Sequence, residues 1–576
     1  MLVVAWCCAM GAWAFDFEAN GIYYRITSAT DKTVEVVSGD AQYSGDVTIP
    51  ATVACDGITY RVTSIGDYAF SGCSSLTSIT LPESLTLIGD EAFYKCSSLT
   101  SIVIPEGVTS IGVGTFYKCS SLVSIIIPER SIRIGDYAFQ DCSSLTAIVI
   151  PEGVTSIESK TFYNCSSLAS ITLPESLTSI GSEAFSYCSS LVTITLPEEI
   201  TSIRNKTFYN CTSLVSIILS ESLTSIGNDA FSGCSNLASI VIPDGVTSIG
   251  GYAFRGCSNL ASIVIPDGVT SINGGTFYKC SSLASIVMPE RVTSIGSFAF
   301  SDCSNLTAIV IPERVTSIER YAFYNCSNLA SIVIPEGVTT IENSAFSGCS
   351  NLTSIVIPEG VTEIGSSAFS GCSSLASIVI PERVTTIGDY AFHLCSSLAS
   401  ITFPESLTSI GENAFYLCSS LASIVIPEGV TSIGEYAFGV CNNLQKIHSQ
   451  AIIPPTCVKN CFWGVDKRAC TLYVPKGTLE AYKAADEWKD FENIAEEEYT
   501  GIEEVGADSA GQAVITACGN GIVVENLPAG TAVTVYTLSG TVVYEGVASG
   551  SRTELTLPAG HLYLVKCGST VTKVAL

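Results

Sequence analysis

A 23-residue repeat fills most of this chain and limits what it can fold into. Cysteine recurs every 23 residues from Cys73 to Cys441, which gives 17 copies without an insertion. In each copy a phenylalanine lies three residues before the cysteine, a leucine three residues after it and an isoleucine six residues after it. One unit of this size cannot bury its apolar face alone, so successive units must stack. The repeat therefore predicts a solenoid.

Two kinds of periodicity alternate within each unit. Residues 76–81 alternate polar and apolar side chains, are rich in β-branched residues and precede Pro82, as a short strand would. Residues 65–73 place Cys73 three residues after Phe70 and four after Ala69, which favours a helical turn or short helix. We therefore predict an α/β-type repeat solenoid of 17 coils over residues 61–448. Its coils are expected to form a parallel sheet plus short helical segments.

The segments next to the repeats differ from them in composition. Residues 1–14 are apolar and end in Ala12-Trp13-Ala14, which predicts a signal peptide, although no Lys or Arg precedes the apolar stretch. A solenoid exposes its core at both ends unless something covers it. We therefore expect residues 15–60 to form an N-terminal cap and residues 449–495 to form a C-terminal cap.

The last part of the chain is expected to be a separate domain. Residues 496–512 are acidic and poor in aromatic side chains, as is typical of a linker. Residues 513–576 contain short alternating runs between glycine-rich turns. This pattern predicts a small all-β sandwich.

The overall charge excludes several classes of partner. The chain carries 26 Lys and Arg against 54 Asp and Glu, a formal net charge of -28. Nucleic-acid binding depends on clustered cations, so we expect neither nucleic acid nor an anionic membrane surface as a partner. After residues 1–14 no segment reaches the roughly 18 to 20 apolar residues that span a bilayer. The mature chain is therefore expected to have no membrane-spanning segment.

The cysteines are interpreted as packing residues. The 17 repeat cysteines share one position, which predicts buried free thiols in the core. A row of metal sites is the alternative, but zinc sites use local clusters such as C-x2-C, which this sequence lacks. Outside the repeats, two groups are candidates for disulfides. They are the trio Cys457, Cys461 and Cys470, and the pair Cys518 and Cys567.

No catalytic constellation is visible. The three histidines, His393, His448 and His561, lie in three different contexts, and the acidic residues are dispersed along the repeat. Acyl or glycosyl transfer needs a base or a carboxylate pair that converges on one point. We therefore predict that the protein is not an enzyme and has no cofactor and no metal site.

The strand offers the strongest candidate binding surface. Thr80 and its equivalents point away from the core in the alternation of the strand, yet ten of the 17 are valine. Exposed apolar rows usually mark interaction surfaces, although valine on a sheet also follows from β propensity. The candidate partner-binding residues are Val241, Val264, Val287, Val310, Val333, Val356 and Val379, with Ser239, Ser262, Ser331 and Ser354 beside them.

Two further rows each have two interpretations. An acidic residue such as Glu83 or Glu106 follows the proline of each strand. This row could attract cations or basic ligand segments, or it could keep the turn solvated. A row of tyrosines after the core phenylalanine could stack on sugars, anchor a protein or pack between coils. Its members are Tyr94, Tyr117, Tyr163, Tyr209, Tyr278 and Tyr324.

Two phrases resemble known families. The phrase IPEGVTSIGxxAFxxCSSL, as at Ile104 to Leu122, resembles the BspA-like leucine-rich repeats of surface proteins from anaerobic bacteria and some protozoa. That resemblance implies adhesion to host extracellular proteins or other cells, without catalysis. The phrase VYTLSGTVVYEG, followed by LPAGHLYLVKCGSTVTKVAL, resembles the C-terminal sorting domain of type nine secretion substrates in Bacteroidetes. It implies transport through the outer membrane, and an ordinary immunoglobulin-like stalk is the alternative.

Together these features predict a non-catalytic binding protein that is secreted or displayed at the cell surface, on the exterior of the outer membrane. We expect an adhesin that docks a protein partner, such as a host extracellular-matrix protein or another cell surface, on the strand face. A structural surface-layer or stalk protein is the alternative, because near-identical repeats leave no unique pocket. A carbohydrate-binding protein is a third possibility. The sequence fixes neither the ligand nor the oligomeric state.

Overall fold

The computed structural model describes residues 15–130 and 133–497, and beyond them Thr531 and seven strands between residues 514 and 575. The chain divides into two compact units, Met1–Arg291 and Val292–Leu576, and each is described by itself. The expected signal peptide lies outside the described residues, as does all but the start of the expected linker.

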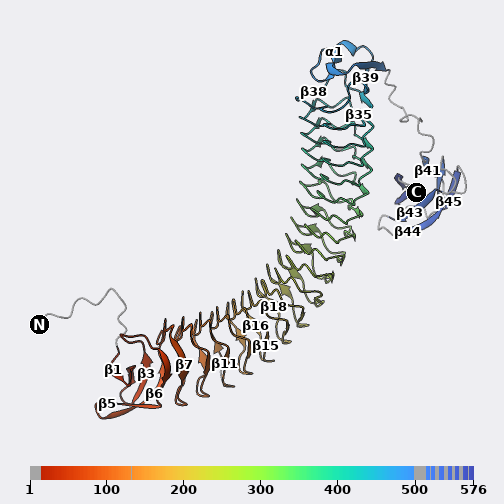
Figure 1. Ribbon diagram of the computed structural model, residues 1–576. Coiled ribbons are helices and arrows are strands. Elements are labelled where there is room, and N and C mark those ends of the chain that lie inside the picture. Colours follow the sequence, from red (N-terminus) through yellow and green to blue (C-terminus); the bar gives the residue numbers. More distant parts are fainter. Residues whose placement is uncertain are drawn as a thin grey trace. The chain divides into compact units, whose positions relative to one another are not determined.

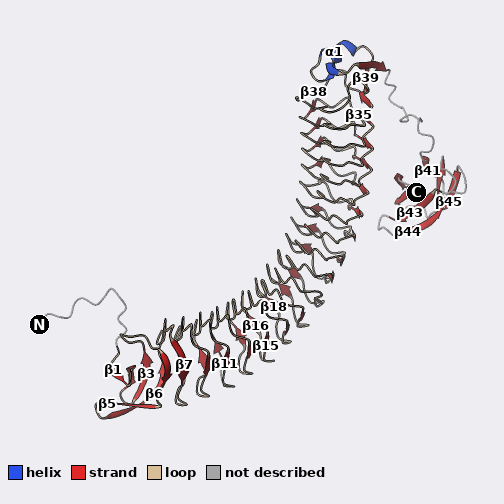
Figure 2. Ribbon diagram, viewed as in Figure 1, coloured by secondary structure: helices blue, strands red, loops and turns tan. Residues whose placement is uncertain are grey.

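Each repeat forms one coil, and within each unit the coils lie side by side (Figure 1). In the described coils, short strands are joined by loops and turns (Figure 2). Most described coils contain two short strands rather than one; no first strand is assigned around Ile240, and Ile341 makes only an isolated bridge to Ile364. The predicted repeat solenoid with a parallel sheet is therefore confirmed, and a second column of strands is added to it.

The first strand of each coil is the predicted one. It carries most of the serine and valine positions of the candidate surface; no strand is assigned at Ser239 and Val241, and Val310 directly follows its strand. In Met1–Arg291 these strands are β7 (Leu76–Thr80), β9 (Ser101–Val103), β11 (Ser124–Ile126), β13 (Ala147–Val149), β15 (Ser170–Thr172), β17 (Thr193–Thr195), β19 (Ser216–Ile218), β22 (Ser262–Val264) and β24 (Ser285–Val287). In Val292–Leu576 they are β26 (Ala308–Ile309), β28 (Ser331–Val333), β29 (Ser354–Val356), β31 (Ser377–Val379), β33 (Ser400–Thr402), β35 (Ser423–Ile426) and β37 (Lys446–Ser449).

The second strand covers the last two residues of the V-T-S-I segment that follows the proline turn. Its isoleucine is buried and the residue before it is at least partly exposed. In Met1–Arg291 these strands are β8 (Leu87–Ile88), β10 (Ser110–Ile111), β12 (Arg133–Ile134), β14 (Ser156–Ile157), β16 (Ser179–Ile180), β18 (Ser202–Ile203), β20 (Ser225–Ile226), β21 (Ser248–Ile249) and β23 (Ser271–Ile272). In Val292–Leu576 they are β25 (Ser294–Ile295), β27 (Ser317–Ile318), β30 (Glu363–Ile364), β32 (Thr386–Ile387), β34 (Ser409–Ile410) and β36 (Ser432–Ile433).

The repeat length sets the register of both sheets. Strands β9 and β11 run parallel and pair Ser101 with Ser124, so each residue faces its equivalent 23 positions later. The second column follows the same rule, as where β14 pairs Ser156 with Ser179 of β16. Because the repeat contains no insertion, equivalent side chains form straight columns along each unit.

Columns of equivalent apolar side chains form the core. The phenylalanine, cysteine and leucine of every repeat are buried. In Met1–Arg291 the rings of successive phenylalanines stack with centroids 5.1 to 5.7 Å apart. Phe185 lies between Phe162 and Phe208, 5.5 Å from each ring. A fully buried side chain of this kind stabilises the fold by about 1.5–3 kcal/mol through the removal of its apolar area from water.

The third side of each coil is a series of turns, and not the short helical segment expected from the spacing. The backbone N–H of Phe70 donates to the carbonyl of Ala92 in the next coil at 2.8 Å, whereas the N–H groups of Ser71 and Cys73 donate to carbonyls three residues earlier. Tyr68 adopts a positive φ of 57°. Hydrogen bonds to the next coil and left-handed residues are both incompatible with a continuous α-helix.

The cysteine column consists of free thiols, as predicted. All 17 repeat cysteines are free and buried. The Cys188 thiol donates to the carbonyl oxygen of Phe162 in the preceding coil at 3.2 Å, and the Cys96 thiol does the same to Phe70 at 3.1 Å. Burial raises the pKa of Cys188 to about 12. The column therefore acts as neutral, hydrogen-bonded core.

The parallel sheets continue past both ends of the repeats. The described residues therefore form about 19 coils instead of the 17 that were predicted. At the N-terminal end β4 pairs in parallel with β7, and at the C-terminal end β37 pairs with β39, which pairs with β40. The flanking elements are β1 (Phe17–Ala19), β2 (Ile22–Ser28), β3 (Thr33–Val37), β4 (Gly45–Thr48), β5 (Thr52–Cys55), β6 (Ile58–Ile65), β38 (Thr456–Cys457), β39 (Thr471–Pro475), α1 (Leu479–Ala484), the 3-10 helix η1 (Trp488–Asp490) and β40 (Asn493–Glu497).

Buried aromatic side chains hold the C-terminal flank onto the last coils. Trp488 is fully buried and its indole N–H donates to the carbonyl of Pro455 at 2.9 Å. Tyr482 is also buried, and its hydroxyl donates to the carbonyl of Ala451 at 2.7 Å. The nearby trio of cysteines expected as disulfide candidates consists of free thiols. The boundaries of the two caps stay predictions.

The C-terminal residues form two antiparallel sheets. One has the order β41-β42-β45 and the other β44-β43-β46-β47, which agrees with the predicted all-β part. The side chains of Cys518 and Cys567 lie outside the described residues. The strands are β41 (Val514–Cys518), β42 (Gly521–Glu525), β43 (Ala532–Thr537), β44 (Val542–Val547), β45 (Arg552–Thr556), β46 (Leu562–Cys567) and β47 (Thr570–Ala575).

Candidate binding surface

The first strand of each coil presents two rows of side chains to solvent. In β9 Ser101 and Val103 are exposed, whereas Ile102 between them is buried, because successive side chains of a strand point to opposite faces. The same pattern occurs in β22 and β31. The sequence-based expectation that the valine positions face away from the core is therefore met.

The candidate valines differ in how far they are exposed. In Met1–Arg291 the exposed fractions are 81% for Val241, 63% for Val264 and 59% for Val287. In Val292–Leu576 Val310 and Val379 reach 68% and 69%. The other two, Val333 and Val356, are only half-buried, as is Ser354, whereas Ser239, Ser262 and Ser331 are exposed. Each unit thus contributes its own part of the candidate surface.

The structure adds a second apolar row that the sequence reasoning missed. Val123, Val192 and Val215 are each exposed by about 45% on the first-strand side of Met1–Arg291. They directly precede the outward residue that opens each strand, such as Ser124 of β11. Strict alternation would place them inward, but the strand starts only after them. In the other repeats this position holds a polar or small residue, as an exposed position would. That pattern is the sequence signal that could have identified the row.

The acidic row lies on the turn after the first strand. Glu83, Glu106 and Glu152 are exposed there. Within the described residues, no group of three or more histidine, cysteine, aspartate or glutamate side chains is arranged to hold a metal ion. Across the same residues, no helix is both long and apolar enough to pass through a membrane.

The histidines lie in separate environments. His393 is partly buried in a repeat turn, which lowers its pKa, and its ring stacks on Tyr416 at 5.7 Å. His448 stacks on Tyr473 at 4.5 Å and lies 3.0 Å from Glu497. His561 lies outside the described residues. The fold does not bring His393 and His448 to a common point.

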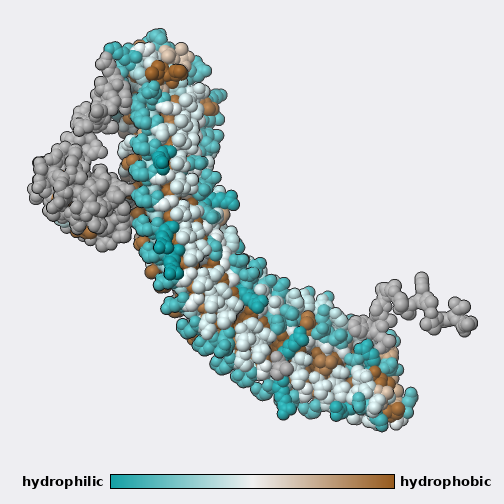
Figure 3. Space-filling view, turned by 180° about the vertical axis from the view of Figure 1, so that it is seen from behind, coloured by the Kyte–Doolittle hydropathy of each residue, from teal (hydrophilic) through white to brown (hydrophobic). Residues whose placement is uncertain are grey.

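The tyrosine row makes contacts between coils. The rings of Tyr94 and Tyr117 are 5.2 Å apart, and Tyr187 makes edge contacts with Tyr163 and Tyr209 at 5.3 and 5.4 Å. These contacts support the interpretation that the tyrosines pack between adjacent coils. Large exposed apolar side chains lie on the first-strand side of each unit, as Val264 and Val379 do. Figure 3 shows the hydropathy of one side of the molecule.

Several solved structures are similar to the chain. A leucine-rich repeat protein from Bacteroides ovatus is 28% identical with a TM-score of 0.42, and the alignment covers 84% of this chain and 100% of that one. A leucine rich cell surface protein from Faecalibacterium prausnitzii is 31% identical with a TM-score of 0.37, over 70% of this chain and 93% of that one. The pneumococcal vaccine antigen PcpA is 18% identical with a TM-score of 0.27, over 84% and 98%.

A family model covers the repeats as well. The model described as "BspA type Leucine rich repeat region (6 copies)" matches residues 57–146, 132–261, 247–376 and 339–464. Comparison of the chain with curated proteins found no match. The matched residues include the phenylalanine, cysteine and leucine columns of the core, and they make up more than half of the chain. The protein therefore belongs to the BspA-type leucine-rich repeat family.

Proposed function

We propose that the protein is a non-catalytic binding protein of the cell surface, an adhesin that docks a protein partner on the first-strand face. The observation that carries the proposal is the exposed valine row, in which Val241 is 81% exposed and Val264 is 63% exposed. A partner that covers these apolar side chains at equivalent positions of successive coils would be stabilised by their burial.

The chemistry of the face suits a protein partner. Most exposed valines of the row have an outward serine two residues earlier, such as Ser262 beside Val264 or Ser285 beside Val287, whereas Val310 has Ala308 there. Apolar contacts thus alternate with hydroxyl groups that can donate and accept hydrogen bonds. Mixed surfaces of this kind are typical of protein interfaces, where polar groups surround apolar ones.

Surface localisation and the sorting role of the C-terminal part belong to the same proposal. A similar protein from Faecalibacterium prausnitzii is described as a cell surface protein, and residues 1–14 have the composition of a signal peptide. The two antiparallel sheets of the C-terminal part suit the sorting-domain resemblance of that segment. We expect this segment to direct the chain through the outer membrane.

The test uses the full mature chain and a panel of soluble extracellular-matrix and plasma proteins, including fibronectin and fibrinogen. A variant with Val241→Lys, Val264→Lys and Val287→Lys places three charges on the candidate face. Covering a valine fully is worth about 1.5 kcal/mol or more, so the variant should lose at least about tenfold in affinity. Surface plasmon resonance measures this loss.

A matched variant places the same charges on the second strand column. It carries Thr109→Lys, Thr155→Lys and Thr201→Lys, three exposed positions in the same unit, and it should bind as the parent chain does. Circular dichroism should show both variants folded. Absence of binding to every protein on the panel would refute the adhesin proposal, and self-association alone would favour the stalk alternative. If both variants lose affinity equally, the binding site does not lie on the first-strand face.

A further inference from the structure

Two adjacent lysines stand out on the turn side of Met1–Arg291. The position before the repeat cysteine holds Lys95 and Lys118 in successive repeats, and the only other lysine at this position is Lys279. Lys95 is exposed and Lys118 is partly exposed. In a chain with a net charge of -28, two neighbouring ammonium groups form an unusual local concentration of positive charge.

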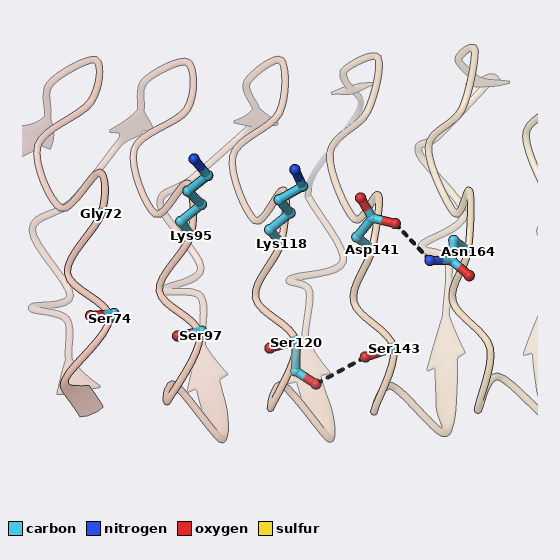
Figure 4. Close-up of a pocket in the computed structure, with 9 residues that line it drawn as sticks. All are labelled: Gly72, Ser74, Lys95, Ser97, Lys118, Ser120, Asp141, Ser143 and Asn164. Carbon is cyan, nitrogen blue, oxygen red and sulfur yellow. Dashed lines mark hydrogen bonds between the residues drawn. The ribbon is translucent and has the colours of Figure 1, made fainter.

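A groove of about 500 Å³ runs along the stack beside these lysines. Figure 4 shows that one wall is the row that contains Lys95 and Lys118 and the other is a row of serines that includes Ser97 and Ser120. The two lysine side chains extend in the same direction from neighbouring coils, away from the serine row, so the ammonium groups lie at the outer edge of the groove. The groove therefore combines cationic groups on one side with hydroxyl groups on the other.

The lysines are held in place but not neutralised. The ammonium of Lys95 lies 4.9 Å from the centre of the Tyr94 ring, and that of Lys118 lies 5.0 Å from the Tyr117 ring. Such contacts restrict the side chain without cancelling its charge. In the described part of the chain, Lys160 has a carboxylate within 4.0 Å, but neither groove lysine has one.

The acidic groups near the groove have other partners. Asp141, in the coil after Lys118, accepts a hydrogen bond from the side-chain amide of Asn164 at 2.7 Å. Glu91 accepts a hydrogen bond from the Tyr68 hydroxyl at 3.5 Å. At the opposite end of the groove from Asp141 lies Gly72, which has no side chain. A negatively charged ligand would thus meet repulsion at the Asp141 end and open space at the Gly72 end.

We propose that this groove binds an acidic polysaccharide. Carboxylate or sulfate groups of neighbouring sugars pair with Lys95 and Lys118, and sugar hydroxyl groups hydrogen-bond with Ser97 and Ser120. The proposal concerns a different side of the coil from the first-strand face. It adds a second class of ligand to the proposed protein-binding function and does not depend on it.

The spacing of the coils is the reason for a linear sugar chain. The Tyr94 and Tyr117 rings, over which the two lysines lie, are 5.2 Å apart, a distance close to the advance of one pyranose unit in an extended polysaccharide. Successive coils can therefore meet successive sugars of the chain. An extended acidic peptide places same-side side chains about 6.6 Å apart, two residues of about 3.3 Å each, so its carboxylates match the spacing of the coils less closely.

The test compares three polymers with one backbone: carboxymethyl cellulose, cellulose sulfate and neutral hydroxyethyl cellulose. Biolayer interferometry with the full mature chain should show binding to one or both charged polymers, weaker at high salt. The two charged polymers distinguish a carboxylate ligand from a sulfate ligand. Lys95→Gln and Lys118→Gln should each lower the affinity by about fivefold, the upper range for an exposed ion pair.

The matched control is Lys279→Gln. Lys279 lies 5.1 Å from its own tyrosine ring, Tyr278, over which Arg255 also lies at 5.6 Å. It does not line the groove, and the equivalent residues in the repeats before and after it are Gly256 and Asp302. This variant should bind as the parent chain does. The proposal is overturned if neither charged polymer binds, if hydroxyethyl cellulose or polyglutamate binds equally well, or if Lys279→Gln weakens binding as much as Lys95→Gln.

Discussion

Raising the pH above 9 should destabilise the repeats through their buried thiols. Burial raises the pKa of Cys188 and Cys280 from the ordinary value of 9.0 to about 12. The unfolded chain therefore loses these protons at a lower pH than the folded chain does. This part of the stability is fully present below pH 9 and is lost as the pH rises from about 9 towards 12.

The size of the effect follows from the two pKa values. At pH 10 an unfolded thiol with a pKa of 9.0 is mostly ionised, whereas a folded thiol with a pKa of about 12 remains protonated. Each such cysteine then costs roughly 1–2 kcal/mol of stability at pH 10. Cys188 and Cys280 together account for about 3 kcal/mol, a large part of the roughly 5–15 kcal/mol that stabilises a typical domain.

The assay is urea unfolding followed by circular dichroism at pH 8 and pH 10, with a reductant present. We compare the parent chain with a variant that carries Cys188→Ala and Cys280→Ala. The variant is expected to be less stable at pH 8, because truncation leaves cavities. Its further loss between pH 8 and pH 10 should be smaller than that of the parent by about 3 kcal/mol.

A control variant separates ionisation from simple destabilisation. Thr207 is buried and its hydroxyl donates to the carbonyl of Arg204 at 2.8 Å, so Thr207→Ala lowers stability without removing a titrating group. Its loss between pH 8 and pH 10 should equal that of the parent. If the cysteine variant also shows the parent's pH dependence, the buried thiols do not control alkaline unfolding and the reasoning fails.

Two other predictions concern the same core. Phe185→Ala should lower the free energy of unfolding by about 3–5 kcal/mol, because Phe185 is fully buried between Phe162 and Phe208; a loss below about 1 kcal/mol in urea unfolding would contradict the stacked core. A thiol reagent at pH 8 should label the partly exposed Cys55 and Cys457 while the 17 repeat cysteines react only in denaturant. Labelling of repeat peptides in the folded chain, read by mass spectrometry, would count against a closed core.

The repeat made much of the fold predictable. A period of 23 residues without an insertion requires parallel coils in register. The cysteine had to face the core because it lies three residues from both the phenylalanine and the leucine of its repeat. The outward valines were also predictable, since alternation along a strand decides which side chains face solvent. Val264 and Val287 follow this rule.

The turn side was less predictable, because side-chain spacing does not show where backbone hydrogen bonds go. The positions of Ala69, Phe70 and Cys73 suit a helix, but the N–H of Phe70 donates to Ala92 of the next coil. The short T-S-I segment was missed as a strand for the same reason. Its pairing exists only when the neighbouring coil supplies the partner, as Ser179 of β16 does for Ser156 of β14.

The sequence by itself determined the solenoid, its register and its thiol core, because identical spacing in every repeat leaves one way to bury the apolar columns. Only the tertiary structure decided where the candidate groove and the second exposed apolar row lie. The groove beside Lys95 and Lys118 is formed by residues from several coils, and the exposed row of Val123, Val192 and Val215 depends on where each strand begins. Such surfaces arise from stacking, so a single repeat does not contain them.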